Sequence, residues 1–120
     1  MSRTPIADYA LISDCHSAAL VSKAGSIDWL CMPRFDSPSV FGRILGDAAG
    51  HWSIGPAMDA SVTREYRSRT MVLETTFRSK TGAATLTDTM AFDPNQKGHD
   101  LGAGAPRLVL RRLKGLEGEL

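Results

Sequence analysis

The stretch RTMVLETTFRSKTGAATLTDTMAF, residues 69–92, decides the fold. From position 71 to 78 a more apolar set of side chains alternates with a more polar one, and the alternation resumes after a turn at 80–82. Successive residues of a β-strand point to opposite faces of its sheet. Threonine-rich alternation is typical of strands with one buried and one solvated face. The stretch therefore predicts a long antiparallel hairpin.

Shorter patterns of the same kind precede it. Residues 9–21 predict two short strands separated by a polar turn, and residues 27–32 predict a return strand. The turn between them contains Gly25, which is free to take a positive φ. Residues 18–32 thus predict a second hairpin, and residues 51–54 predict a brief strand that ends at a Gly-Pro pair.

The pattern changes twice after the long hairpin. Residues 93–106 contain glycines and prolines but few large apolar residues, which predicts a loop. Residues 107–113 predict a strand, followed by a turn at 114–118. A hairpin partner is then expected from Glu119 onward, so we expect a truncated sheet with an unpaired edge at 107–113. Such edges pair with other chains, which predicts a homo-oligomer through this strand.

Helical character is confined to one segment. Ser37-Pro38 is typical of a helix start, because serine caps free N–H groups and proline is tolerated at the first helical position. Apolar residues at 40, 41, 44 and 45 recur at helical spacing, and Gly46 ends the run. The chain as a whole predicts one domain, residues 1–120, of the mostly β class: an antiparallel, supersandwich-like β-sandwich with one short helix.

Composition limits the partners and the cellular location. The 120 residues carry 14 Lys and Arg against 13 Asp and Glu, so a formal net charge of +1 gives no reason to expect nucleic acid or an anionic membrane as partner. No apolar run approaches the ~20 residues that cross a bilayer, and the N-terminus does not resemble a secretory signal. Two cysteines are too few for a disulfide framework, so we expect a reduced, cytoplasmic protein; the alternative is a Cys15–Cys31 bridge.

The chain predicts no catalytic residue, no metal site and no cofactor. Its cysteines and histidines lack the paired spacing of zinc ligands. Ser13, Asp14 and His16 are neighbours on one short turn, and their diverging side chains cannot easily converge on one substrate atom. Hydrolysis of sugars needs two facing carboxyl groups. The sequence shows no opposed pair in an apolar pocket among the four glutamates, which are Glu65, Glu74, Glu117 and Glu119.

The stretch GSIDWLCMPRFDSPSVF, residues 25–41, carries more chemistry than a turn requires. Two interpretations remain open. In the first, Ile27, Trp29 and Cys31 face a core, and the charged residues on either side of Phe35 form an ion pair that closes a turn. In the second, an aromatic and charged surface faces a partner, because Trp, Phe and Arg are enriched in protein interfaces. A sugar ring is the weaker version of this idea. The candidate interface residues are Trp29, Arg34, Phe35 and Asp36.

Several stretches together resemble the N-terminal segment of the trehalase-like and glucoamylase-like proteins of glycoside hydrolase family 15. They are IADYALISDCHSAALVSKAGSIDWLCMPRFDSPSVFGRILGD, HWSIGPA, REYRSRTMVLETTF, TGAATLTD and RLVLRRLKGLEGEL, in this order. The resemblance covers nearly the whole chain, and DWLCMPRFDSPSVF is its most specific match. Small departures are Ser13, where glycine is common, Met32, where leucine is common, and Met90-Ala91, where Met-Pro is frequent.

The resemblance implies a β-sandwich that precedes a catalytic barrel of paired helices, which hydrolyses α-glucosidic bonds with inversion. The catalytic glutamates of the family belong to that barrel and match no position here, so the chain is expected to be non-catalytic. Its expected partner is the absent catalytic domain, with residues 29–39 near the junction and at the rim of the substrate pocket. The alternative is a free-standing carbohydrate-binding or self-assembly module. The sequence does not determine whether the parent enzyme uses trehalose or an α-glucan.

Overall fold

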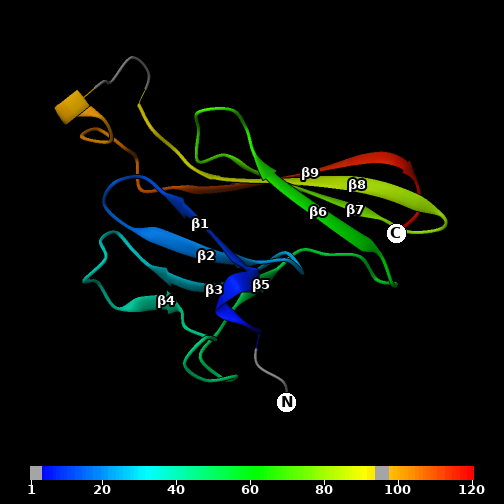
Figure 1. The fold of residues 1–120 in the computed structure, drawn as a ribbon. Coiled ribbons are helices and arrows are strands. Elements are labelled where there is room, and N and C mark those ends of the chain that lie inside the picture. Colours follow the sequence, from blue (N-terminus) through cyan, green and yellow to red (C-terminus); the bar gives the residue numbers. More distant parts are fainter. Residues whose placement is uncertain (1–3, 94–97) are drawn as a thin grey trace.

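The computed structural model describes residues 4–93 and 98–120, which form a β-sandwich of antiparallel sheets that face each other (Figure 1). The mostly β prediction is confirmed. The first sheet has the order β1-β2-β3-β4, and β5 also pairs with β3. The second sheet has the order β6-β7-β8-β9. The strands are β1 Tyr9–Ser13, β2 Ala18–Ser22, β3 Ser26–Cys31, β4 Ser39–Phe41, β5 Trp52–Ser53, β6 Ser61–Tyr66, β7 Leu73–Arg78, β8 Gly82–Met90 and β9 Val109–Gly118.

Both predicted hairpins are confirmed. β2 and β3 pair around a turn in which Gly25 has a φ of +81°. β7 and β8 pair over six residue pairs, and buried residues alternate with partly exposed ones along both strands. The buried faces of the two sheets meet in one core, because apolar side chains removed from water stabilise the fold. One packed cluster of this core contains the buried residues Ile12, Ala19, Val21, Ile27, Leu30, Leu73 and Met90.

The predicted helix at 37–46 is wrong. Residues 39–41 form β4, which pairs with the end of β3, and turns follow it. The backbone N–H groups of Gly42 and Arg43 donate to the carbonyl oxygen of Gly50. A two-turn helix is marginal by itself, and glycine inside it costs roughly 1 kcal/mol. The open edge of β3 offers this segment backbone hydrogen bonds that a helical pattern in the sequence does not reveal.

Two strands differ from the expectation. β6 was not predicted, although Val62 and Arg64 alternate with exposed residues along it. β9 continues to Gly118, so the turn predicted at 114–118 is wrong. β9 follows β8 over its full length, and a register shift at Ala83/Ala84 accommodates one additional residue. The loop predicted at 93–106 is confirmed except for a short 3-10 turn at Gly98–Asp100; its residues 94–97 lie outside the described ranges.

A second register shift changes which side of β3 faces the core. Trp29 pairs with Leu20 and Ile27 pairs with Val21, so Asp28 is an additional residue in a bulge. Ile27 and Leu30 therefore belong to the core, whereas Trp29 is only partly buried and lies outside it. The prediction that Trp29 shares the core face with Ile27 is wrong, because strict alternation fails at a bulge.

A buried ion pair within the second sheet includes an arginine that also bonds to the first sheet. The Nε of Arg111 lies 2.7 Å from Oδ1 of Asp88, and both side chains are fully buried. The same guanidinium donates to the carbonyl oxygens of Trp52 and Gly25, at 2.7 Å and 2.6 Å, and stacks on the Trp52 ring. Burial raises the pKa of the Asp88 carboxyl, while Arg111 acts in the opposite direction. Arg111 thus connects β9 to two segments of the first sheet.

The hydroxyl of Tyr9 donates to Oδ2 of Asp28 at 2.6 Å, and this bond makes stability sensitive to alkaline pH. Burial, together with this hydrogen bond, raises the pKa of Tyr9 above its ordinary value of 10.0. The folded state therefore keeps the proton to higher pH than the unfolded chain. The stabilisation is complete below pH ~10 and is lost as the pH rises through the folded pKa.

Replacing Tyr9 with phenylalanine should lower the free energy of unfolding at pH 7 by about 1–3 kcal/mol, because the buried Asp28 carboxylate loses a hydrogen-bond donor. The difference between wild type and variant should shrink at pH 11, where the wild type has lost this contribution. Urea unfolding of both proteins at pH 7 and pH 11 measures this difference in the free energy of unfolding. A difference that does not change with pH would contradict the role of the Tyr9–Asp28 hydrogen bond.

Candidate functional site

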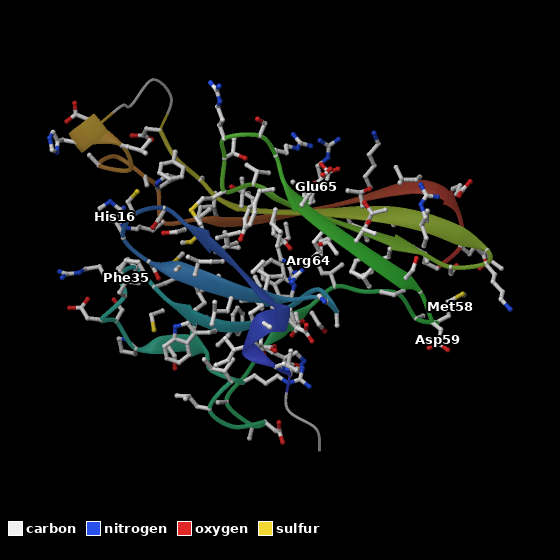
Figure 2. All side chains as sticks on the ribbon, in the orientation of Figure 1. His16, Phe35, Met58, Asp59, Arg64 and Glu65 are labelled. Atoms are coloured by element: carbon white, nitrogen blue, oxygen red, sulfur yellow. The ribbon has the colours of Figure 1, made fainter. Side chains whose placement is uncertain are left out.

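Three loops meet at one end of the sandwich and form the candidate site, which we call the loop end: residues 14–17, 32–38 and 98–105. His16 holds them together, and Figure 2 shows it close to Phe35. Its carbonyl oxygen accepts the N–H of Phe35 at 2.9 Å, and its ring Nε2 lies 2.6 Å from the carbonyl oxygen of Gly102. Gly102 has a φ of +80°, and a Cβ there would lie 2.6 Å from the Asp14 carbonyl oxygen. The third loop therefore packs directly against the first.

The loop from Arg34 to Asp36 has a fixed backbone and exposed side chains. The N–H of Arg34 donates to the Ser37 hydroxyl, and the N–H of Ser37 donates to the Arg34 carbonyl oxygen. The Nε of Arg34 lies 3.1 Å from Oδ1 of Asp36, and both side chains are about 70% exposed. Phe35 is 61% exposed. The loop thus combines the predicted ion pair with the predicted exposed surface.

Trp29 does not lie in this loop. It belongs to β3, where its partner is Leu20, which in turn pairs with Leu11 of β1. None of these three residues belongs to the core, and Leu11 is 41% exposed. The structure therefore brings together three of the four candidate residues and places the fourth on the outer face of the first sheet.

The polar turn before β2 is a structural motif. Oδ1 of Asp14 accepts the N–H groups of His16 and Ser17, each at 2.9 Å, whereas its Oδ2 is buried without a hydrogen-bond partner in the described structure. The Ser13 hydroxyl donates to the Ser17 carbonyl oxygen. Because the His16 ring is turned toward Gly102, the three residues of an imagined triad do not form one. Both cysteines of the chain are free.

One pair of glutamates lies in register, which the sequence did not reveal. Glu65 of β6 is directly opposite Glu74 of β7. Glu65 is exposed, and Glu74 forms an ion pair with Arg67 at 3.2 Å. A glycosidase needs a carboxyl group that stays protonated in an apolar environment. This pair lies on the solvated face of the second sheet, so it lacks the environment of such an acid.

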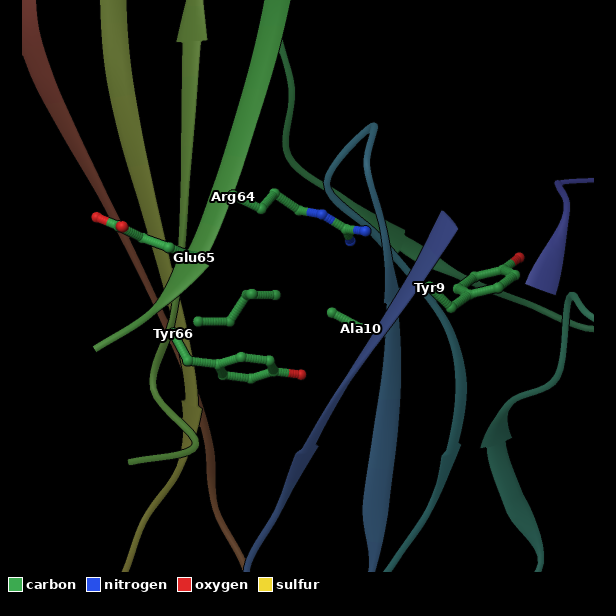
Figure 3. A pocket seen from close by; sticks show the side chains of 6 residues that line it. Tyr9, Ala10, Arg64, Glu65 and Tyr66 are labelled. Carbon is green, nitrogen blue, oxygen red and sulfur yellow. The ribbon is translucent and has the colours of Figure 1, made fainter. Parts of the chain in front are cut away.

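A cleft of about 260 Å³ separates the edge strands β1 and β6 (Figure 3). Arg64 and Tyr66 point from β6 toward the first sheet, whereas Glu65 points away. The Arg64 side chain donates to the Val21 carbonyl oxygen, and the Tyr66 hydroxyl bonds both the N–H and the C=O of Leu11. The polar groups of this cleft thus serve to hold the sheets together. Its lining residues are Tyr9, Ala10, Arg64, Glu65, Tyr66 and Leu73.

Neither a metal site nor a membrane span is found in the described ranges of the chain. Residues 4–93 and 98–120 contain no group of three or more His, Cys, Asp or Glu that could hold a metal ion. Within the same ranges no helix has the length and apolar character to cross a bilayer.

Comparison with known proteins gives a consistent result. The family model described as trehalase-like, N-terminal, matches residues 1–101. The trehalase of Mycolicibacterium smegmatis is 46% identical over 91 residues, which are 75% of this chain and 14% of that protein. The trehalase of Mycobacterium tuberculosis is 44% identical over 98 residues, 81% of this chain and 14% of that protein. Trehalase 1 of Sulfolobus acidocaldarius is 49% identical over 74 residues, 62% of this chain and 13% of that protein.

The chain thus spans about one seventh of the length of these curated relatives. No solved structure gives a significant match.

Proposed function

Since the chain belongs to the trehalase-like N-terminal domain family, we propose that it is the non-catalytic N-terminal domain of a longer enzyme that hydrolyses trehalose. The curated relatives are named trehalases, and the matched region is a small fraction of each of them. None of the four glutamates is buried in the described structure, and Glu65, which borders the cleft between β1 and β6, points away from the first sheet. The carboxyl groups that break the glycosidic bond then belong to the rest of the enzyme. Membership in glycoside hydrolase family 15 and an inverting mechanism belong to this proposal.

The observation that carries the proposal is the fixed and exposed loop from Arg34 to Asp36. A side chain that is exposed on a fixed backbone has little freedom to lose when a partner covers it, so preorganisation favours docking. Phe35 offers a large apolar surface, flanked by a cation and an anion that already face each other. Aromatic and arginine side chains of this kind dominate the free energy of many interfaces. We propose that this loop docks the sandwich against the catalytic domain and borders its substrate pocket.

In a trehalase-length protein that carries this domain, replacing Phe35 with alanine should weaken the docking. We expect a Tm lower by about 2–4 °C and a kcat/KM for trehalose lower by about tenfold, which corresponds to ~1.4 kcal/mol. Differential scanning calorimetry and glucose release measure the two effects. Leu45→Ala is the matched control, because Leu45 is a 73% exposed apolar residue outside the loop end.

Maltose and isomaltose, assayed beside trehalose, test the proposed substrate. Unchanged Tm and unchanged hydrolysis in both Phe35→Ala and Arg34→Ala would rule out the docking role. The 120-residue chain alone should release no glucose; release that is abolished by replacing one of its own glutamates would overturn the proposed function itself.

A further inference from the structure

The free edge of β9 has the features of a docking site for another strand. β9 is ten residues long and pairs with β8 from Val109 to Gly118. It ends the strand order of the second sheet, so within the described residues its other edge faces no strand. An edge of this length presents a row of unpaired N–H and C=O groups, and protein sheets protect such edges with prolines, charged side chains, bulges, short strands or coverage. β9 itself contains no proline.

This edge is held rigidly. Arg111, near the middle of β9, is anchored by Asp88, Trp52 and Gly25, and its side chain is fully buried. The exposure that remains at Arg111 therefore comes from its backbone. A strand fixed in this way is a preorganised template for backbone pairing.

Apolar side chains beside the edge lack a cover. Leu113 pairs with the fully buried Leu86, yet Leu113 is 58% exposed. β9 is the end strand of its sheet, so within the described residues Leu113 has a neighbouring strand on one side only. Leu110 and Leu116 are also almost half exposed. An added strand with apolar residues would cover some of this surface.

The charges along β9 indicate which kind of strand can pair with its free edge. Arg112 and Lys114 pair with Thr87 and Thr85, so both cations lie on the solvated face, and no ion pair is found for either among the described residues. Glu117 of the same strand already pairs with Arg78. Opposite charges directly across a strand pair are favourable, and like charges are unfavourable.

A second copy of the chain is a poor match for the middle of this edge. Antiparallel pairing of two copies of β9, centred anywhere from Arg111 to Lys114, brings cations of the two copies directly opposite or diagonal to each other. A homo-oligomer through this strand, expected from the sequence, therefore has an electrostatic cost, and sedimentation of the 120-residue chain tests whether it forms.

We propose that the free edge of β9 binds an extended, acidic segment of the same longer polypeptide as a fifth strand. This segment carries Asp or Glu side chains opposite Arg112 and Lys114, and an apolar side chain beside Leu113. The inference rests on the proposed function in one respect, namely that the domain belongs to a protein about seven times its length. The geometry of the edge is independent of any activity.

Hydrogen exchange of residues 109–118 tests the proposal in the 120-residue chain and in the trehalase-length protein. We expect the outward-facing amides of β9 to exchange at least about tenfold more slowly in the longer protein, because a strand partner protects them. The double replacement Arg112→Glu and Lys114→Glu should remove this protection. Lys80→Glu is the control, because Lys80 is an exposed cation on the β7–β8 turn of the same sheet. Lys114→Gln repeats the comparison with a smaller change, should the double variant unfold.

Equal exchange in the two proteins would overturn the proposal, and so would protection that survives both the double replacement and Lys114→Gln. A sedimenting dimer of the 120-residue chain with protected β9 amides would identify a second copy as the occupant instead. None of these readouts depends on trehalose hydrolysis, so loss of the proposed activity and loss of the strand partner are separate results.

Discussion

Replacing Asp88 with alanine should lower the free energy of unfolding by about 3–5 kcal/mol. The guanidinium of Arg111 would remain in the interior, because its bonds to the Trp52 and Gly25 carbonyl oxygens hold it there. It would then be a buried charge without its counterion. Such a charge destabilises the fold far more than an exposed charge that has lost its partner. Urea unfolding at pH 7 measures the loss.

An exposed ion pair of the same sheet is the control for Asp88. Arg78 and Glu117 lie 3.2 Å apart, and their side chains are 58% and 68% exposed. Removing either should cost less than ~1 kcal/mol, because water screens both charges. A similar loss for Glu117→Ala and Asp88→Ala would show that burial of the Arg111 pair has no special role.

Gly25→Ala should destabilise the fold by at least about 2–3 kcal/mol. Alanine is strained at a φ of +81° even without a clash. In addition, its Cβ would lie 2.0 Å from the carbonyl oxygen of Ile54. Relief of this clash must move a backbone segment, because Ile54 is bonded through its own N–H to the Gly25 carbonyl oxygen. The same movement would displace an acceptor of Arg111.

Gly46→Ala is the matched control, because a Cβ at Gly46 meets nothing within 4 Å. We expect a change within roughly 0.5 kcal/mol for this variant. Thermal unfolding of both proteins gives the comparison. Equal Tm values for the two variants would show that the turn between β2 and β3 adapts without cost.

The hairpins could be predicted from sequence because their information is local. Residues 69–92 carry both the alternation and the turn, and the structure has β7 and β8 there. The error at 37–46 has a different origin. That segment has helical spacing, but the decisive interaction is with the edge of β3, which no local pattern contains. β6 was missed because its inward face carries Arg64 and Tyr66, whose long side chains reach the first sheet with polar tips.

The candidate site was predictable to a similar degree. Arg34 and Asp36 are close in sequence, so their ion pair could be expected, and the exposure of Phe35 followed from the same turn. The position of Trp29 could not be predicted, because the bulge at Asp28 changes which side chains of β3 face the core. The role of His16 depends on Gly102, which is 86 residues away. Contacts of this kind come from the fold as a whole.

The hydroxyl of Tyr66 has a consequence for self-association. By occupying both backbone groups of Leu11, it blocks the outer side of β1 to an incoming chain. At the opposite border of that sheet, β4 and β5 have only three and two residues. A fibre grows by strand pairing only if every molecule has two open edge strands, one that pairs with the preceding molecule and one that pairs with the next. The second sheet ends in β9, with ten residues, and in β6, with six residues that border the cleft beside β1, so β9 is the longest edge in the described structure at which a strand can be added.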